Sequence, residues 1–124
     1  MPKKEVPVDF LQHYLPERTG DPVTIFLQQY KVHLTITRER KTILGDYRHR
    51  TPINTHRISI NSSLNQYAFL ITLLHELAHL LTFEKYGNRV QAHGKEWKTT
   101  FSELLKQFIE KSVFPPDIQS ALSV

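Results

Sequence analysis

The feature that most constrains this chain is a strongly apolar stretch, residues 63–86, that carries a single polar stripe. Ser63 and Gln66 have the Ser-x-x-Gln spacing of a capping box, and Gly87 stands where a left-handed residue ends a helix. We therefore expect one long helix that ends at Tyr86. Unpaired polar side chains are costly in so apolar a helix, so the stripe needs partners. It consists of Thr72, His75, Glu76, His79, Thr82 and Tyr86.

The centre of this stripe is the pentapeptide His75-Glu76-Leu77-Ala78-His79, an H-E-x-x-H pattern. It places two imidazoles one helical turn apart on the same face, where both can bind one ion. Zinc favours four ligands, and a catalytic site keeps one position open for water. Zinc lowers the pKa of that water toward about 7, and Glu76 can take its proton as hydroxide attacks a carbonyl. The pattern predicts one Zn²⁺ bound by His75 and His79, with Glu76 as a general base.

The third ligand has several candidates. The chain has no cysteine, so a metal must be held by His, Asp or Glu. His93 leads, because it follows the Gly87 turn and precedes Gly94, where a loop can fold it back onto the long helix. The alternative for His93 is an ordinary histidine in a surface loop. Downstream carboxylates are also candidates, as are the histidines at His13, His33, His49 and His56.

The rest of the sequence predicts an α+β domain around the long helix. Apolar residues alternate with period two in residues 32–37 and 58–60, which indicates strands. Residues 42–48 predict a third strand, with Gly45 as a bulge or a point of close backbone approach. We expect a small three-stranded antiparallel sheet. Flanking helices are predicted before Pro16, from the Asp21-Pro22 capping pattern onward, and after His93 until Pro115.

A single domain covering residues 1–124 is expected, because 124 residues suffice for one core but not for two. The ends, 1–7 and 112–124, are expected to be loosely ordered. The N-terminus lacks the apolar block of a secretory signal, and the most apolar run, 68–74, falls far short of the roughly 18 residues that span a bilayer. We therefore expect a cytoplasmic protein without a membrane partner, and we take it as a monomer.

The chain is modestly basic, with a formal net charge of +4, and cationic residues concentrate between Arg38 and Arg57. Two interpretations of this segment remain open: an edge that contacts DNA phosphates beside the active site, or a solvated strand face. Tyr47 and Trp97 either stack on bases or belong to the core and the cleft wall. The six candidate nucleic-acid contacts are Arg38, Arg40, Lys41, Arg48, Arg50 and Arg57.

Residues 75–101, HELAHLLTFEKYGNRVQAHGKEWKTTF, closely resemble the active-site segment of the SprT-like metalloproteases, which include the Spartan DNA-protein crosslink proteases. The resemblance also rests on His93-Gly94-x-x-Trp97 and on the hairpin from Leu44-Gly45-Asp46-Tyr47 to Ile58-Ser59-Ile60-Asn61, and it covers roughly residues 26–108. It implies a compact, minimal zincin-like metalloprotease domain. By the same resemblance Glu76 is the catalytic glutamate, and the zinc ligands are His75, His79 and His93.

The resemblance implies a zinc endopeptidase that cleaves a protein or peptide substrate, including DNA-bound or crosslinked proteins. Many members carry a C-terminal cysteine-based zinc ribbon, and this chain departs from them because it has no cysteine. One alternative is a zinc-containing, nucleic-acid-associated protein linked to transcription, with little or no protease activity. Another is a metal-free helical interaction domain. Candidates for stabilising the oxyanion are Tyr47, Tyr86 and an arginine.

Overall fold

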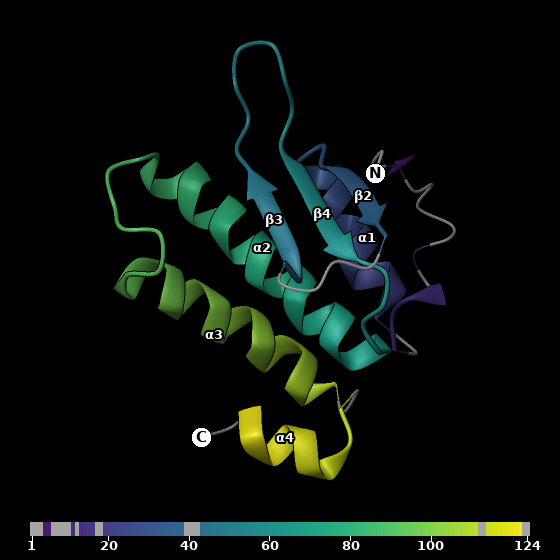
Figure 1. The fold of residues 1–124 in the computed structure, drawn as a ribbon. Coiled ribbons are helices and arrows are strands. Elements are labelled where there is room, and N and C mark those ends of the chain that lie inside the picture. The colour runs from purple at the N-terminus through teal and green to yellow at the C-terminus, as the bar shows by residue number, and fades with distance from the viewer. Residues whose placement is uncertain are drawn as a thin grey trace.

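The computed structural model describes residues 4–5, 11, 13–16, 19–38, 43–111 and 114–122. In these residues a small sheet packs on the longest helix, which confirms the α+β class (Figure 1). The helices are α1 (Gly20–Gln29), α2 (Gln66–Tyr86), α3 (Lys95–Glu110) and α4 (Pro116–Leu122). The strands are β1 (Lys4–Glu5), β2 (His33–Thr37), β3 (Gly45–Arg48) and β4 (Arg57–Asn61). No helix in the described part of the chain has the length and hydropathy of a membrane span.

The sheet is mixed, with the strand order β1-β2-β4-β3, so the prediction of a purely antiparallel sheet is wrong. β3 and β4 form an antiparallel hairpin, as expected, with Arg48 opposite Arg57. β4 then lies between β3 and β2 and runs parallel to β2, with Leu34 opposite Ile58. The period-two pattern identifies strands and their faces but carries no information on the direction in which a neighbour runs. In this sheet β4 follows β3 in the chain but inserts between β3 and β2, and there it runs parallel to β2.

The end segments contain two elements that sequence analysis did not predict. β1 pairs antiparallel with β2, with Lys4 opposite Ile36. α4 begins at Pro116, immediately after Pro115, and both elements lie within segments for which loose order was expected. The helix predicted before Pro16 falls largely on residues outside the described part of the chain. Its described remainder contains a turn in which the backbone N–H of Tyr14 donates to the carbonyl of Leu11 at 3.0 Å.

The core lies between α2, the sheet and α3. α2 packs against β3 and β4 on one side and against α3 on another, and Figure 1 shows it passing behind β3. Fully burying one large apolar side chain stabilises a fold by about 1.5–3 kcal/mol. Because α2 buries several such side chains, it makes the main apolar contribution to the stability of the core. Its buried residues are Phe69, Leu70, Leu73, Leu74, Glu76, Leu77, Ala78, Leu80 and Thr82.

The start of α2 differs from the predicted capping box. The N-cap is Asn65, whose side-chain oxygen accepts hydrogen bonds from the backbone N–H groups of Tyr67 and Ala68 at 3.0 and 2.9 Å. The Ser63 hydroxyl instead donates to Asn61 at 2.8 Å. Asparagine is at least as good a cap as serine, and Asn65 lies directly before the helix. The predicted end is confirmed, because Gly87 has a φ of 65° and its N–H donates to the carbonyl of Phe83.

The start of α1 also differs from the prediction. Its N-cap is Thr19, two residues before the predicted Asp21. The predicted first-turn proline, Pro22, still lies in the first turn, where its missing N–H leaves no helical hydrogen bond unmade.

Replacing Asn65 by Ala should lower the free energy of unfolding by about 1 kcal/mol, because two N–H groups at the start of α2 lose their acceptor. Urea unfolding measures this loss. Ser62→Ala, at an exposed neighbouring position, is the matched control and should leave stability unchanged. A larger loss for Ser63→Ala than for Asn65→Ala would contradict this assignment of the cap.

Candidate metal centre

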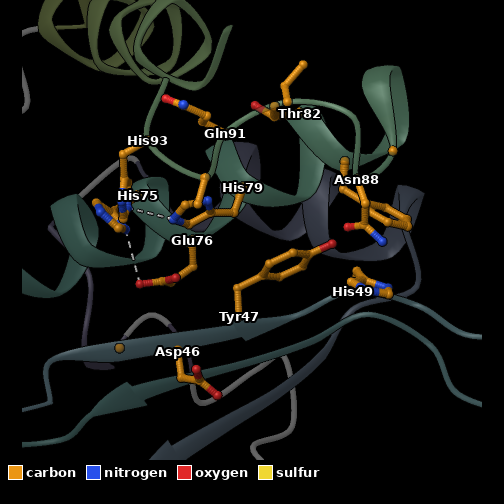
Figure 2. Close-up of a pocket in the computed structure, with 15 residues that line it drawn as sticks. Asp46, Tyr47, His49, His75, Glu76, His79, Thr82, Asn88, Gln91 and His93 are labelled. Atoms are coloured by element: carbon orange, nitrogen blue, oxygen red, sulfur yellow. Dashed lines mark hydrogen bonds and ion pairs between the residues drawn. The ribbon is translucent and has the colours of Figure 1, made fainter. Parts of the chain in front are cut away.

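The three histidines predicted as metal ligands lie together. One ring nitrogen of each lies within 4.8 Å of the others, so His75, His79 and His93 could hold a metal ion. His75 and His79 project from one face of α2, and His93 comes from the loop that joins α2 to α3 (Figure 2). The Gly87 turn and the short loop after it bring His93 back over the helix. His93 is an exposed residue of this loop, and its ring lies within the cluster.

The donor set fits a divalent ion. The Nε2 atoms of His79 and His93 face one another at 3.0 Å, where two neutral rings can form a hydrogen bond only if one nitrogen carries the proton. A metal ion accepts the lone pairs of both nitrogens. Tetrahedral zinc with Zn–N bonds of about 2.0–2.1 Å places two nitrogen ligands about 3.4 Å apart. That separation lies between the observed 3.0 Å and the 4.8 Å limit of the cluster, so small side-chain movements suffice.

The electrostatic environment prepares His79 to bind a metal. Burial lowers the pKa of His79 to about 4; the Glu76 carboxylate opposes the shift, while His75 and His93 add to it. Only a neutral imidazole has a lone pair for a metal ion. The ring of His79 is therefore neutral at pH 7.

Trp97 supports all three histidine rings from the first turn of α3. Its ring centroid lies 4.8, 5.3 and 4.7 Å from those of His75, His79 and His93, and its indole N–H donates to the carbonyl of His75 at 3.3 Å. The side chain is buried, and its other face stacks on Phe101. Of the two interpretations left open for Trp97, the core and cleft-wall position is therefore the one observed.

Glu76 lies beside the cluster and is only 6% exposed. Its Oε2 is 3.2 Å from His75 Nδ1, and both residues line a cavity of about 450 Å³ together with His79 and His93. A proton on His75 Nδ1 that points at this carboxylate leaves the lone pair on Nε2 for a metal. The carboxylate predicted as the general base is thus placed at the same cavity as the candidate ligands.

Gly45 lets β3 pass directly over this carboxylate. A Cβ atom built on Gly45 would lie 2.7 Å from Thr72 Cγ2, 3.1 Å from Glu76 Oε2 and 3.3 Å from the carbonyl oxygen of Ser59. The first of these contacts is too short for real atoms. The close backbone approach predicted at Gly45 is therefore confirmed, and its partners on α2 are Thr72 and the catalytic candidate Glu76.

Tyr47 forms the wall of the cavity next to His79, with the two rings parallel within 7° and their centroids 6.2 Å apart. Its hydroxyl lies 2.9 Å from His56 Nδ1, and Figure 2 shows the ring extending away from Glu76. Burial, with a contribution from Glu84, raises the pKa of Tyr47, so the hydroxyl keeps its proton and can donate it. The other tyrosine candidate, Tyr86, does not line the cavity; Lys85 Nζ lies 5.4 Å from its ring.

His56 is the buried partner of the Tyr47 hydroxyl, a role that the sequence did not predict, because His56 was predicted only as a candidate metal ligand. It is 2% exposed, and its Nδ1 also accepts the backbone N–H of Arg50 at 3.2 Å. Its Nε2 lies 3.3 Å from Glu84 Oε2, which Arg50 Nε also contacts at 2.7 Å. Burial lowers the pKa of His56 despite the opposing carboxylate. The usable signal was the β3–β4 hairpin, because Tyr47 lies within β3 and His56 directly precedes β4.

The remaining candidates are spread over the molecule. Four of the candidate histidines lie outside the three-histidine cluster: His13, His33, His49 and His56. Of these four, His49 lines the cavity. Arg50 is paired with Glu84 on α2, whereas Arg48 and Arg57 face each other on neighbouring strands. Arg38 is exposed at the end of β2, and Arg40 and Lys41 lie outside the described residues. Of the described candidates, Arg48 and Arg57 are therefore the pair that the sheet brings side by side.

Comparison with known proteins identifies a matching family. The SprT-like family model matches residues 12–119, a span that includes all three histidines and Glu76. Protein SprT of Vibrio atlanticus is 30% identical over 91 residues, which are 70% of this chain and 54% of the relative. Protein SprT of Vibrio parahaemolyticus is 33% identical over 82 residues, 63% of this chain and 49% of the relative. The chain thus spans about half the length of these relatives. No solved structure gave a significant match.

Replacing His93 by Ala should weaken zinc binding by at least about 100-fold, because removing a ligand exceeds the 10–100-fold loss typical of its outer partners. Competition with a chromophoric chelator measures the affinity, and the wild-type chain should bind one ion. His49→Ala is the matched control, since His49 lines the same cavity outside the cluster. Equal losses in the two variants would show that the cluster is not the binding site.

Replacing Gly45 by Ala should lower the free energy of unfolding by about 1–3 kcal/mol, because the added methyl group overpacks the contact between β3 and α2. Urea unfolding provides the value. Thr72→Ser removes the Cγ2 atom of the shortest contact, so the double variant should recover part of the loss. A Gly45→Ala protein as stable as the wild type would contradict the close approach.

Proposed function

The chain belongs to the SprT-like family, and from this premise we propose that it is a zinc-dependent endopeptidase in which Glu76 is the general base. The observation that carries the proposal is the buried carboxylate of Glu76 at the same cavity as the three-histidine cluster. Three histidine ligands, which leave a fourth position open for water, with a carboxylate nearby, form a donor set suited to hydrolysis by zinc. A purely structural zinc site is usually closed by four protein ligands and needs no general base.

The three histidines and Glu76 have different roles in the proposed reaction. Zinc, when bound by His75, His79 and His93, polarises a carbonyl and lowers the pKa of water. Glu76 takes the proton of the attacking water and can pass it to the leaving amine. Its burial limits competition from bulk solvent, and the Gly45 backbone above it limits its movement.

The position of β3 favours an extended peptide as the substrate. β3 is an edge strand of the described sheet, paired with β4 alone, and Gly45 to Tyr47 line the cavity. Unpaired backbone groups on an edge strand accept a further strand, so a peptide that adds to β3 would lie along the metal centre. Only an extended segment can bind in this way. Loosely folded proteins are therefore the expected substrates, and compact folded domains should be resistant.

A narrower form of the proposal is that the substrates are DNA-bound or crosslinked proteins. The exposed guanidinium groups of Arg48 and Arg57, next to the cavity strand β3, support it. The same arginines support the alternative of a zinc-containing, nucleic-acid-associated protein without peptidase activity. The two proposals differ in what Glu76 does, because only the peptidase needs its carboxylate for turnover.

Replacing Glu76 by Gln should lower kcat/KM for cleavage of a loosely folded protein by about 10²–10⁴-fold, because the general base is lost. The assay compares zinc-loaded proteins with and without single-stranded DNA. Zinc content should stay at the wild-type level, which separates loss of chemistry from loss of metal. Glu103→Gln, an exposed carboxylate on α3, is the matched control and should retain full activity.

Equal cleavage by the wild type and Glu76→Gln would show that Glu76 is not the general base. No cleavage by the zinc-loaded wild type, with or without DNA, would favour the binding-protein alternative. Activity that rises with single-stranded DNA would support the narrower proposal.

A further inference from the structure

A second cavity, of about 360 Å³, lies on the face of the sheet opposite α2. Side chains alternate along a strand, and Tyr47 and Ile58 face α2 and the core. Arg48, Arg57 and Ser59 therefore point to the other face, where they line this cavity. Figure 2 shows Asp46 on the side of β3 away from the histidines. The two cavities share Asp46 as a lining residue, and all their other lining residues differ.

The register of the strands arranges this cavity in two rows. His33 is opposite Arg57 and Arg57 is opposite Arg48, so these three side chains form one row across β2, β4 and β3. In the adjacent row, Thr35 is opposite Ser59 and Ser59 is opposite Asp46. Arg48 and Arg57 are exposed, while Thr35 and Ser59 are buried. The cavity therefore has a cationic rim and a floor that carries hydroxyl groups.

Ser59 provides an unsatisfied donor in this floor. The residue is 3% exposed, and its Oγ is buried without a hydrogen-bond partner among the described residues. A buried hydroxyl that lacks a partner destabilises the fold, so such groups are rare unless a water or ligand satisfies them. Ser59 is one of the residues that line the cavity, so an acceptor atom of a ligand that reached its buried hydroxyl would be the missing partner.

The charges around the floor favour an anion. Cross-strand neighbours of like charge repel each other, and Arg48 and Arg57 are such neighbours. Asp46 lies 3.5 Å from Arg48 Nε and offsets part of this charge, whereas Arg57 makes no ion pair with a described residue. Two guanidinium groups and one carboxylate together carry one net positive charge, and the other titratable lining residue, His33, can only add to it. A bound anion with at least one negative charge would balance it.

We propose that this cavity binds a phosphate group that carries one negative charge, either as a free phosphate or as a phosphodiester of a nucleic-acid backbone. Guanidinium groups recognise phosphate oxygens through paired, charge-assisted hydrogen bonds. Donors from β3, β4 and the floor come from different directions, which suits the tetrahedral oxygens of a phosphate better than the two coplanar oxygens of a carboxylate. The inference does not depend on peptidase activity.

The test is a titration of the zinc-loaded protein followed by ¹H–¹⁵N NMR, first with inorganic phosphate and then with a short single-stranded oligodeoxynucleotide. Saturable shifts are expected at the backbone amides of Arg48, Arg57 and Ser59. Shifts confined to His75, His79 and His93 would place the anion at the metal centre instead and overturn the proposal. Saturation by phosphate alone identifies a free phosphate as the ligand, whereas much tighter binding of the oligonucleotide identifies the phosphodiester.

Three variants make the outcome specific. Arg57→Gln should weaken binding about tenfold, the factor for losing one charge-assisted hydrogen bond. Asp46→Asn should tighten binding, because it removes the only carboxylate among the residues that line the cavity. Ser59→Ala should weaken binding and yet raise the melting temperature, because it removes a buried donor that has no partner in the unliganded protein.

Lys98→Gln is the matched control, since Lys98 is an exposed cation on α3, outside the cavity. If Lys98→Gln weakens binding as much as Arg57→Gln does, the anion is attracted by overall charge and the site is refuted. No saturable shift with either probe would also refute it. Weaker phosphate binding by Asp46→Asn would contradict the charge argument and overturn the proposal.

Discussion

At Gly45, β3 passes so close to α2 that no side chain fits between them; even a methyl group would lie 2.7 Å from Thr72 Cγ2. The contact fixes the height of the sheet above the helix. Because β3 is held there, Tyr47 lies against His79, Glu76 lies under the strand, and the edge of β3 borders the cavity. A sheet displaced by the width of one side chain would separate the candidate general base from the strand on which we expect the substrate to lie.

The polar stripe of α2 is tolerated because each of its central members has a partner. Glu76 is buried against His75, the Thr82 hydroxyl donates to the carbonyl of Ala78 at 2.7 Å, and His79 faces His93. Trp97 then covers the three imidazoles from α3 and holds His75 through its carbonyl. The apolar remainder of α2 supplies the packing energy that keeps this arrangement in place. Stability and site geometry therefore depend on the same helix, with different faces serving each.

The sequence predicted the features that depend on local spacing. The i, i+4 histidines, Glu76 between them, the turn at Gly87 and the close approach at Gly45 are all properties of short segments. The position of His93 depends on the path of the loop after Gly87, and the family resemblance supported its prediction as a ligand. Three other features depend on which strands become neighbours. They are the direction of β2 relative to β4, the network of His56 with Tyr47, Arg50 and Glu84, and the unpaired Ser59 hydroxyl. Asn65 shows the same limit at a helix start, because the Ser-x-x-Gln spacing predicted a cap at Ser63 and the observed cap lies two residues later.

Alternation along β3 gives one short strand two separate surfaces. Gly45 and Tyr47 line the cavity of the metal centre and Arg48 lines the second cavity, while Asp46 borders both. A ligand that held Arg48 and Arg57 together would relieve their repulsion and strengthen the pairing of β3 with β4 at the end of the hairpin. It would act on β3, whose free edge we propose receives the peptide. It would nevertheless touch none of the residues that we propose bind the metal. A phosphate-bearing partner could therefore change how firmly β3 is held for substrate without any direct contact with Glu76 or the histidines.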